Sequence, residues 1–286
     1  HRHRVYTRDA HCIFIHDGDD GRHPVKPGLD ILQPAWKDRA PASVDALFTC
    51  RDGGVSSGAY GNAEGIMGLN VAPHTGDFGA CVRMNRSIVA QLVPSDPVWL
   101  RQVHGTEVVD ADTAEGEPEA DASVSTKPGV VCTVMTADCL PVLLANREGT
   151  VVAAVHAGWK SLAAGIIGKT IRVMRERAPE STGFVAWLAP RIGPEAFEVG
   201  PDVREAMLAG LPEADRAFTQ GEGDRLMCDL ALLAKMALAA EGVSEDDVFD
   251  CGLSTYSHPR RFYSFRRDGE KSGRHAAMIW IKPEEA

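Results

Sequence analysis

The sequence predicts an α+β fold rather than a regular alternation of strands and helices. Apolar, β-branched runs gather in clusters, and amphipathic stretches lie between the clusters instead of following each strand. This order is typical of α+β proteins and shows no clear second domain. The chain has 286 residues, of which 44% are hydrophobic and 24% are charged. Such a composition is ordinary for a globular protein and suffices to bury a sizeable core.

The first part of the regular region contains most of the expected strands. Residues 46–50 form a short strand candidate that leads into the turn-rich string RDGGVSSG. Residues 85–92 have the apolar spacing of a helix, whereas residues 98–103 alternate as a strand does. Three apolar runs separated by turns are expected to be buried neighbouring strands: 130–135, 141–145 and 151–156.

The remainder of the chain adds most of the helices. Residues 161–177 form an amphipathic stretch, with Ser161 as the candidate N-cap. Residues 184–188 are a further strand candidate. Two more helices are expected at 201–209, which begins with a proline, and at 228–241. The final expected strands are residues 261–265 and 276–281.

Residues 1–43 differ in character from the rest. The string HDGDDGRHPVKPG is polar, rich in glycine and proline, and without periodicity. We therefore expect a loosely structured N-terminal tail at 1–43, dispensable for folding, and a single catalytic domain at 44–286.

Charge and cysteine content limit the classes of partner and the compartment. The net charge is −10, which gives no global attraction to nucleic acid or to an anionic membrane, so we expect neither as a partner. No apolar run is long enough to span a bilayer, and the first residues lack the apolar region of a secretory signal. Seven cysteines without a CxxC pair predict reduced thiols and a cytoplasmic location. The sequence sets no oligomeric state.

Three segments place a metal-binding side chain beside tight-turn residues: His104 in RQVHG, Cys139 in TADCLP and His156 in AVHAGW. Each falls at the end of an expected strand. Two imidazoles and one thiolate suit zinc, and a three-ligand site leaves one position open for catalysis. The same residue types also fit a Cys139 nucleophile with His156 as its base, or ordinary buried side chains. Spacing alone does not separate these alternatives.

A family resemblance favours the metal site. The strings RQVHGTEVV, ADASVSTKPG, TADCLPVLLAN, VVAAVHAGWKSLAAGI, WLAPRIGPEAFEVG and FYSFRRDG resemble, in order, the motifs of the bacterial purine nucleoside phosphorylase/polyphenol oxidase family, which is related to the human laccase domain-containing protein. The resemblance implies zinc held by His104, Cys139 and His156. It also implies cleavage of adenosine, inosine, guanosine and methylthioadenosine with phosphate, and deamination of adenosine.

The resemblance also implies a fold and an alternative function. It implies a sandwich of mixed β-sheets flanked by helices, similar to the catalytic domain of cytotoxic necrotizing factor toxins. Those toxins use a Cys–His pair, so a cysteine hydrolase with Cys139 and His156 is the alternative function.

The older family label, laccase, implies copper chemistry. A multicopper oxidase needs many histidine ligands in HxH and HCH strings, but this chain has ten histidines and one HxH string, at residues 1–3. A single His/His/Cys site could still bind Cu²⁺ in place of zinc and oxidise phenols adventitiously.

Phosphorolysis requires a phosphate site, for which four cations are candidates. Arg51 precedes two glycines in the string CRDGG, and an arginine fork with nearby backbone amides suits a phosphate. Arg266 and Arg267 in FSFRRDG, together with Lys160, are the others. The structural alternative for each is an ordinary turn or a solvated charge.

Deamination requires a proton shuttle beside a metal-bound water. Asp138, next to Cys139, and Glu107 are the expected catalytic carboxylates, with Asp121 as a weaker candidate. Either of the first two could instead orient a histidine ligand.

Overall fold

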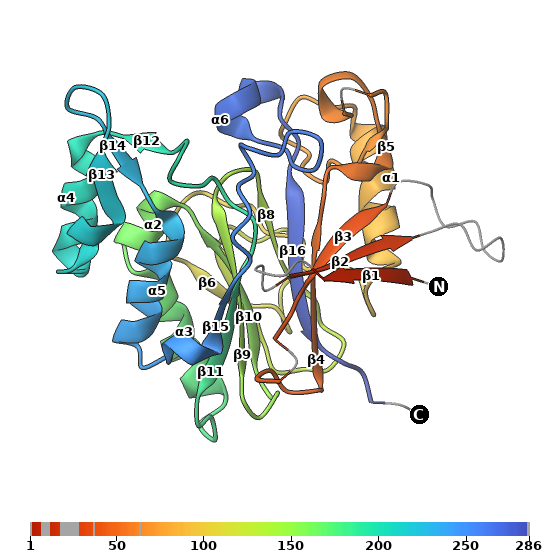
Figure 1. The fold of residues 1–286 in the computed structure, drawn as a ribbon. Helices are drawn as coiled ribbons and strands as arrows, with labels where there is room; N and C mark the ends of the chain where they lie inside the picture. Colours follow the sequence, from red (N-terminus) through yellow and green to blue (C-terminus); the bar gives the residue numbers. More distant parts are fainter. Residues whose placement is uncertain (1, 7–11, 18–28, 37, 63, 285–286) are drawn as a thin grey trace.

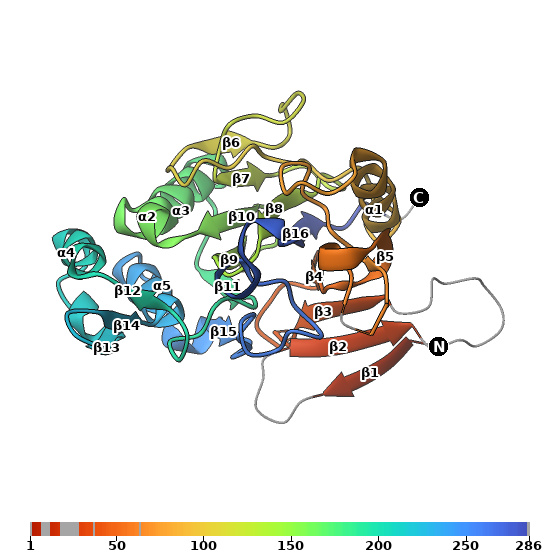
Figure 2. The ribbon, with the colours of Figure 1, turned by 90° about the horizontal axis from the view of Figure 1, so that it is seen from above.

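The computed structural model describes residues 2–6, 12–17, 29–36, 38–62 and 64–284. Two six-stranded sheets face each other; several helices cover the outer face of one sheet, and the single helix α1 lies on the outer face of the other (Figures 1 and 2). This arrangement confirms the expected α+β class with sheets flanked by helices, although only one of the two sheets is mixed.

The first sheet contains the first and the last described strands and is antiparallel throughout. Its strands, in spatial order, are β1 (Arg2–Tyr6), β2 (Cys12–Asp17), β3 (Asp30–Pro34), β4 (Val44–Thr49), β16 (His275–Ile281) and β8 (Cys132–Thr136). The short strand β5 (Asp52–Ser56) follows β4 and lies against α1.

The second sheet is mixed. Its order is β15 (Val248–Asp250), β11 (Phe184–Leu188), β9 (Leu140–Asn146), β10 (Val152–Ala157), β7 (Ala122–Ser125) and β6 (Val108–Asp110). The pairs β11–β15 and β6–β7 are parallel, and the others are antiparallel. Every residue of β9 and β10 is buried, because both faces of this sheet are covered. Their sequences therefore read as continuous apolar runs rather than as alternation.

Three apolar layers hold the molecule together. The layer between the sheets includes Phe48, Leu143 and Trp187. Outside the second sheet, the core extends to α2 (Trp159–Ala163), α3 (Ile166–Arg177), α4 (Pro201–Gly210) and α5 (Leu230–Ala240). Outside the first sheet, α1 (Gly79–Ala90) contributes Ile88 and Val89. The shared central layer explains why the two sheets form one body.

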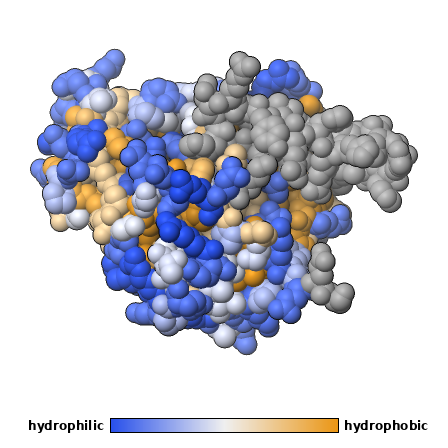
Figure 3. Space-filling model, turned by 60° about the horizontal axis from the view of Figure 1, so that its bottom comes forward, coloured by the Kyte–Doolittle hydropathy of each residue, from blue (hydrophilic) through white to orange (hydrophobic). Residues whose placement is uncertain are grey.

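Small elements complete the chain. A three-stranded sheet lies beside α4 and consists of β12 (Glu198–Val199), β14 (Leu226–Cys228) and β13 (Phe218–Gln220). The short helices are η1 (Gly58–Tyr60), η2 (Ala214–Ala217), η3 (Glu245–Asp247), α6 (Phe265–Asp268) and η4 (Gly269–Lys271). On the face in Figure 3, apolar residues gather at the left, the side on which α4 and α5 lie in Figure 1. No helix in the described part of the chain is long and apolar enough to cross a membrane.

Three expected elements differ in the structure. Residues 98–103 make only isolated bridges, at Val98 and Arg101, because they run along a loop beside the sheets. Residues 261–265 form a turn that leads into α6. The helix expected at 161–177 begins at Trp159 and breaks at Gly165, whose φ of +89° favours glycine; Ser161 lies inside α2 and is not its cap.

The expected loose tail is wrong for residues 30–34. These residues form β3, which pairs with β2 and β4, and Leu32 is fully buried in the layer between the sheets. Asp30 accepts hydrogen bonds at 2.8 and 2.9 Å from the guanidinium of Arg261. The short apolar run is long enough to form a strand between two others despite its Gly/Pro surroundings. The division of function between residues 1–43 and 44–286 stays a prediction.

Candidate metal centre and its cavity

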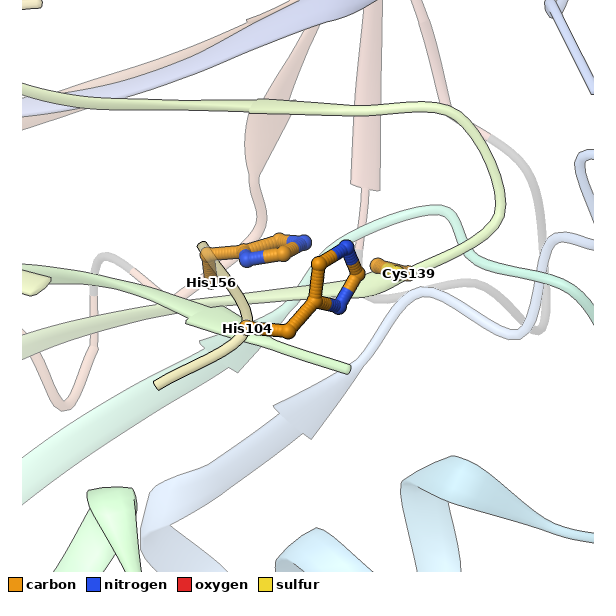
Figure 4. A group of neighbouring side chains, drawn as sticks. All are labelled: His104, Cys139 and His156. Atoms are coloured by element: carbon orange, nitrogen blue, oxygen red, sulfur yellow. The ribbon is translucent and has the colours of Figure 1, made fainter. Parts of the chain in front are cut away.

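One strand and two loops at strand ends bring the expected ligands together. His156 belongs to β10, Cys139 lies between β8 and β9, and His104 lies in the loop before β6. One ligand atom from each residue lies within 4.8 Å of the other two (Figure 4). No other group of this kind occurs in the described part of the chain. His104 is exposed, Cys139 is half-buried and His156 is buried, so the group is open on one side.

Asp121 organises two of the three ligands. This fully buried carboxylate accepts a hydrogen bond of 2.7 Å from Nδ1 of His156, which leaves Nε2 of that ring for a metal. It also accepts backbone hydrogen bonds of 3.1, 3.0 and 2.9 Å from Val103, His104 and Gly105. Burial acts to raise the pKa of Asp121, but these hydrogen bonds outweigh it and lower the pKa. Asp121 therefore stays charged and holds both histidine segments.

The two histidines differ in their protonation energetics. Burial and the charge of His156 lower the pKa of His104, which favours the neutral imidazole that binds metal. Burial opposes the charge on His156, but Cys139 and Asp121 raise its pKa to about 9. In the protein without a metal, His156 therefore favours its protonated form. A metal cation would replace the ring proton of His156 that faces Cys139.

Two of the turns use strained backbone. His104 and Asp138 are the non-glycine residues with positive φ in the described part of the chain, at 58° and 91°. Asp and His tolerate this region better than branched residues do, but it still costs energy, and such strain is often found at functional sites. Each residue either is or directly precedes a ligand.

Asp138 fastens the Cys139 loop to the segment around α6. Its carboxylate accepts hydrogen bonds of 2.7 Å from Thr255 Oγ1, 3.0 Å from Ser264 Oγ and 2.7 Å from the backbone N–H of Arg266. The Asp138 carbonyl accepts another from the backbone of Ile192, at 2.8 Å. These contacts fit a positioning role better than that of a free acid or base.

Gly158 leaves the space that two ligands occupy. A Cβ at this position would lie 3.1 Å from His104 Nδ1 and 3.2 Å from Cys139 Sγ. The glycine of the string AVHAGW is therefore explained by close packing of the ligand group against the start of α2.

A cavity of about 360 Å³ opens onto the three ligands. Aromatic side chains that line it are Trp159, Phe197 and Phe265. Asp138 is the carboxylate that lines it among the described residues, and its oxygens are already engaged. An apolar wall with a few polar groups is typical of a small-molecule site.

Three cations line the same cavity: Lys160, Arg266 and Arg274. The structure thus brings two of the four expected phosphate contacts to the site and adds Arg274, which sequence reasoning missed. Burial lowers the pKa of Arg274, while the nearby charges of Cys139 and Asp138 act to raise it. The signal that could have identified Arg274 is its place immediately before the last strand, which pairs with the strand that leads to Cys139.

The other two expected phosphate contacts are structural. The guanidinium of Arg51 is buried and donates to the backbone carbonyls of Gly61, Pro259 and Ala59, at 2.8, 3.0 and 3.2 Å. Arg267 donates to the carbonyls of Thr255, Tyr256 and Phe262. Neither lines the cavity. Both arginines close loops, because a fork of N–H donors satisfies several turn carbonyls at once.

Glu107 also lies outside the cavity. Its side chain is 64% exposed and sits 3.9 Å from Lys169 on the surface, while its backbone carbonyl accepts from Asp121 and Ala122. The structure does not place this carboxylate where it could move a proton for a bound substrate.

The donor set fits a borderline-soft divalent ion. A thiolate with two imidazoles suits zinc and also copper, and Asp121 supplies the orienting carboxylate that such histidines usually have.

Comparison with known proteins places this geometry in a family. Residues 45–282 match the family described as multi-copper polyphenol oxidoreductase laccase. A protein of Shigella flexneri named purine nucleoside phosphorylase YfiH is 44% identical over 257 residues, which cover 88% of this chain and 98% of that protein. A purine nucleoside phosphorylase of Pseudomonas aeruginosa is 43% identical over 252 residues, covering 88% and 98% of the two chains.

Solved structures agree. The crystal structure of a Neisseria meningitidis protein, 43% identical, matches with a TM-score of 0.79 and covers 88% of this chain and 99% of that one. YlmD from Geobacillus stearothermophilus, 26% identical, also matches with a TM-score of 0.79 and covers 90% and 97%. The chain therefore belongs to the multi-copper polyphenol oxidoreductase laccase family, as the resemblance of its motifs predicts.

Proposed function

We propose that this protein is a zinc-dependent purine nucleoside phosphorylase that acts on adenosine, inosine, guanosine and methylthioadenosine. The observation that carries the proposal is the cavity, which combines the His104/Cys139/His156 group with three cations and aromatic walls. Relatives over 40% identical are named purine nucleoside phosphorylase, which supports the same reaction. We also propose a cytoplasmic location, on the basis of the cysteine content.

In the proposed reaction, a phosphate oxygen forms a bond to C1′ of the ribose as the bond from C1′ to the purine nitrogen breaks. The purine takes the electron pair and the proton that the hydrogen phosphate gives up, and the other product is ribose 1-phosphate, or 5-methylthioribose 1-phosphate from methylthioadenosine. The cavity cations would bind and orient the phosphate dianion. Phe197 and Phe265 offer flat apolar surfaces for the purine. Zinc held by the three ligands would supply Lewis acidity to an oxygen of the substrates.

Adenosine deaminase activity remains part of the proposal as a side activity. Deamination needs a carboxylate that exchanges protons with water and substrate. Asp138 lines the cavity, but its oxygens already accept from three donors. We therefore expect deamination to be slower than phosphorolysis.

A cysteine hydrolase is the second candidate, and one specific observation favours it. Asp121 holds His156, and His156 lies beside Cys139, which is the order of a nucleophile, a base and an orienting acid. His104 argues for a metal instead, because such a triad does not need a second imidazole within 4.8 Å. A hydrolase of this kind should keep its activity after the metal is removed.

A copper-dependent polyphenol oxidase is the third. The described part of the chain holds a single three-ligand group, whereas a multicopper oxidase needs a type 1 site and a trinuclear cluster. A lone Cu²⁺ at this group could still oxidise phenols slowly.

The test is a nucleoside panel incubated with the purified, zinc-loaded protein, with and without phosphate. We expect free purine and ribose 1-phosphate in equal amounts, and only when phosphate is present. Release of free ribose at the same rate without phosphate would contradict phosphorolysis and point to hydrolysis.

A further inference from the structure

The cations that line the cavity lack the partners that cations elsewhere in this chain have. Lys160, Arg266 and Arg274 have no carboxylate within 4.0 Å among the described residues, although the chain carries a net charge of −10. Most other described arginines do have such a partner. A cavity with unpaired cations in an acidic protein is arranged for an anion.

Arg274 lies beside the metal ligands because of strand register. His275 pairs with Thr136 at the junction of β16 and β8, so Arg274 comes opposite Ala137, two residues before Cys139. Its backbone N–H donates to Oδ1 of Asn70 at 2.9 Å, and Asn70 is fully buried. The position of Arg274 is therefore fixed by the fold before any ligand binds.

The guanidinium of Arg274 is only partly engaged. Nη1 donates to the carbonyls of Ser272 and Gly273 at 2.8 and 3.1 Å, and the ring of Phe265 lies 5.5 Å from the guanidinium carbon. No described residue accepts from Nε or Nη2. One edge of the fork is thus free, and this is the edge that binds an oxyanion in a bidentate manner.

Lys160 reaches the cavity from the other sheet. It follows His156 by four residues, at the start of α2, and its ammonium group lies 5.7 Å from the ring of Trp159 without an ion pair among the described residues. Arg266 is less available, because its Nη1 donates to the carbonyl of Glu198 at 3.0 Å and its guanidinium lies over Phe197. The two cations that flank the ligand group with free donors are Arg274 and Lys160.

We propose that Arg274 and Lys160 form a subsite for a phosphate dianion beside His104, Cys139 and His156. The proposal rests on the proposed function for the role of this phosphate as the second substrate. The anion is inorganic phosphate before the reaction and a phosphate monoester after it. Both carry a doubly charged phosphate group, whose oxygens the free edge of Arg274 and the ammonium group of Lys160 would bind.

The experiment is calorimetric titration of inorganic phosphate into zinc-loaded protein, without nucleoside. We expect Arg274→Gln to weaken phosphate binding about tenfold to a hundredfold, as loss of charge-assisted hydrogen bonds does, and Lys160→Gln about tenfold. Arg274→Lys should fall between Arg274→Gln and the parent, because it keeps the charge but loses the fork. Arg83→Gln is the matched control. Arg83 is an exposed cation on α1, outside the cavity, and its substitution removes the same charge.

Parallel titration with ribose 1-phosphate separates the two sources of phosphate. Equal losses for both ligands in Arg274→Gln would support one shared subsite. Parent-like binding of inorganic phosphate by both Arg274→Gln and Lys160→Gln would overturn the proposal. Lys160 is exposed, so Lys160→Gln gives a result even if Arg274→Gln does not fold.

The subsite and the proposed function can fail separately. Phosphate binding that depends on Arg274, in a protein that cleaves no nucleoside, would leave the subsite standing and the function refuted. Phosphorolysis with an unchanged phosphate KM in Arg274→Gln and Lys160→Gln would support the function and refute the subsite.

Discussion

Gly158→Ala is a small change that should disturb the metal group without replacing any of its three ligands. The backbone at Gly158 has φ −69° and ψ 166°, which alanine adopts readily, so the change adds no backbone strain. The new methyl group would lie 3.1 Å from His104 Nδ1 and 3.2 Å from Cys139 Sγ. Ordinary carbon contacts start near 3.5 Å, so both ligands must move by a few tenths of an ångström.

The expected effect falls on metal affinity more than on folding. Disturbing the surroundings of metal ligands typically costs about tenfold to a hundredfold in affinity, and we expect a loss in that range. Crowding should cost about 1–3 kcal/mol of folding free energy, and the lower chain entropy of alanine should return about 0.4–1 kcal/mol. The protein should therefore still fold.

Competition with a zinc-binding dye measures the affinity, and urea unfolding of the metal-free protein measures the stability. Gly105→Ala is the control next to the same histidine, because its methyl group would meet only ordinary contacts, 3.6 Å from Val103 and 3.7 Å from Asp121. We expect it to bind zinc as the parent does. Parent-like zinc affinity in Gly158→Ala would refute the account of this glycine.

Four further predictions test residues whose roles the structure revises or adds. Arg51→Ala should lower the free energy of unfolding, measured in urea, by about 3 kcal/mol, because three backbone carbonyls lose their donor. The folded fraction should keep the phosphate KM of the parent, and a selective rise in that KM would show that Arg51 contacts phosphate. Asp138→Asn should keep at least about a tenth of the activity, since the Thr255 hydroxyl can reverse its hydrogen bond, whereas loss of a general acid or base costs about 10²–10⁴-fold in kcat. Burial lowers the pKa of His275 to about 3, so the stability that its neutral form contributes is complete above pH 6.5 and is lost as the pH falls toward 3, by about 1.4 kcal/mol at pH 5.5. Urea unfolding across this range should show the free energy of unfolding falling with pH, and His275→Asn should weaken that dependence. Removal of residues 1–36 deletes β3 and should lower Tm clearly, contrary to the expectation of a dispensable tail; an unchanged Tm would show that β3 contributes little.

The sequence predicts the fully buried strands well for a physical reason. The segments that became β8, β9 and β10 are buried on both faces, so they are uninterrupted apolar runs that local patterns identify. Short strands among turn residues carry weaker signals. Strand β3 is five residues long and lies among Gly/Pro clusters, and its burial depends on partners elsewhere in the chain, such as β4.

The candidate site divides in the same way. His104, Cys139 and His156 are identified by residue type and motif, and the structure brings them together. The charged residues around them could not be ranked from sequence, because an arginine in a turn has the same local pattern whether it binds carbonyls or faces a cavity. Arg51 does the first and Arg274 the second, and only tertiary contacts distinguish them.

Zinc content per chain, measured by mass spectrometry for the parent and for Cys139→Ala, tests the central claim most directly. The account predicts about one zinc per chain in the parent and a large loss in Cys139→Ala, together with loss of phosphate-dependent nucleoside cleavage. Full zinc content in Cys139→Ala would contradict the assignment of this thiolate as a ligand. If cleavage were nevertheless lost, Cys139 would be a nucleophile instead.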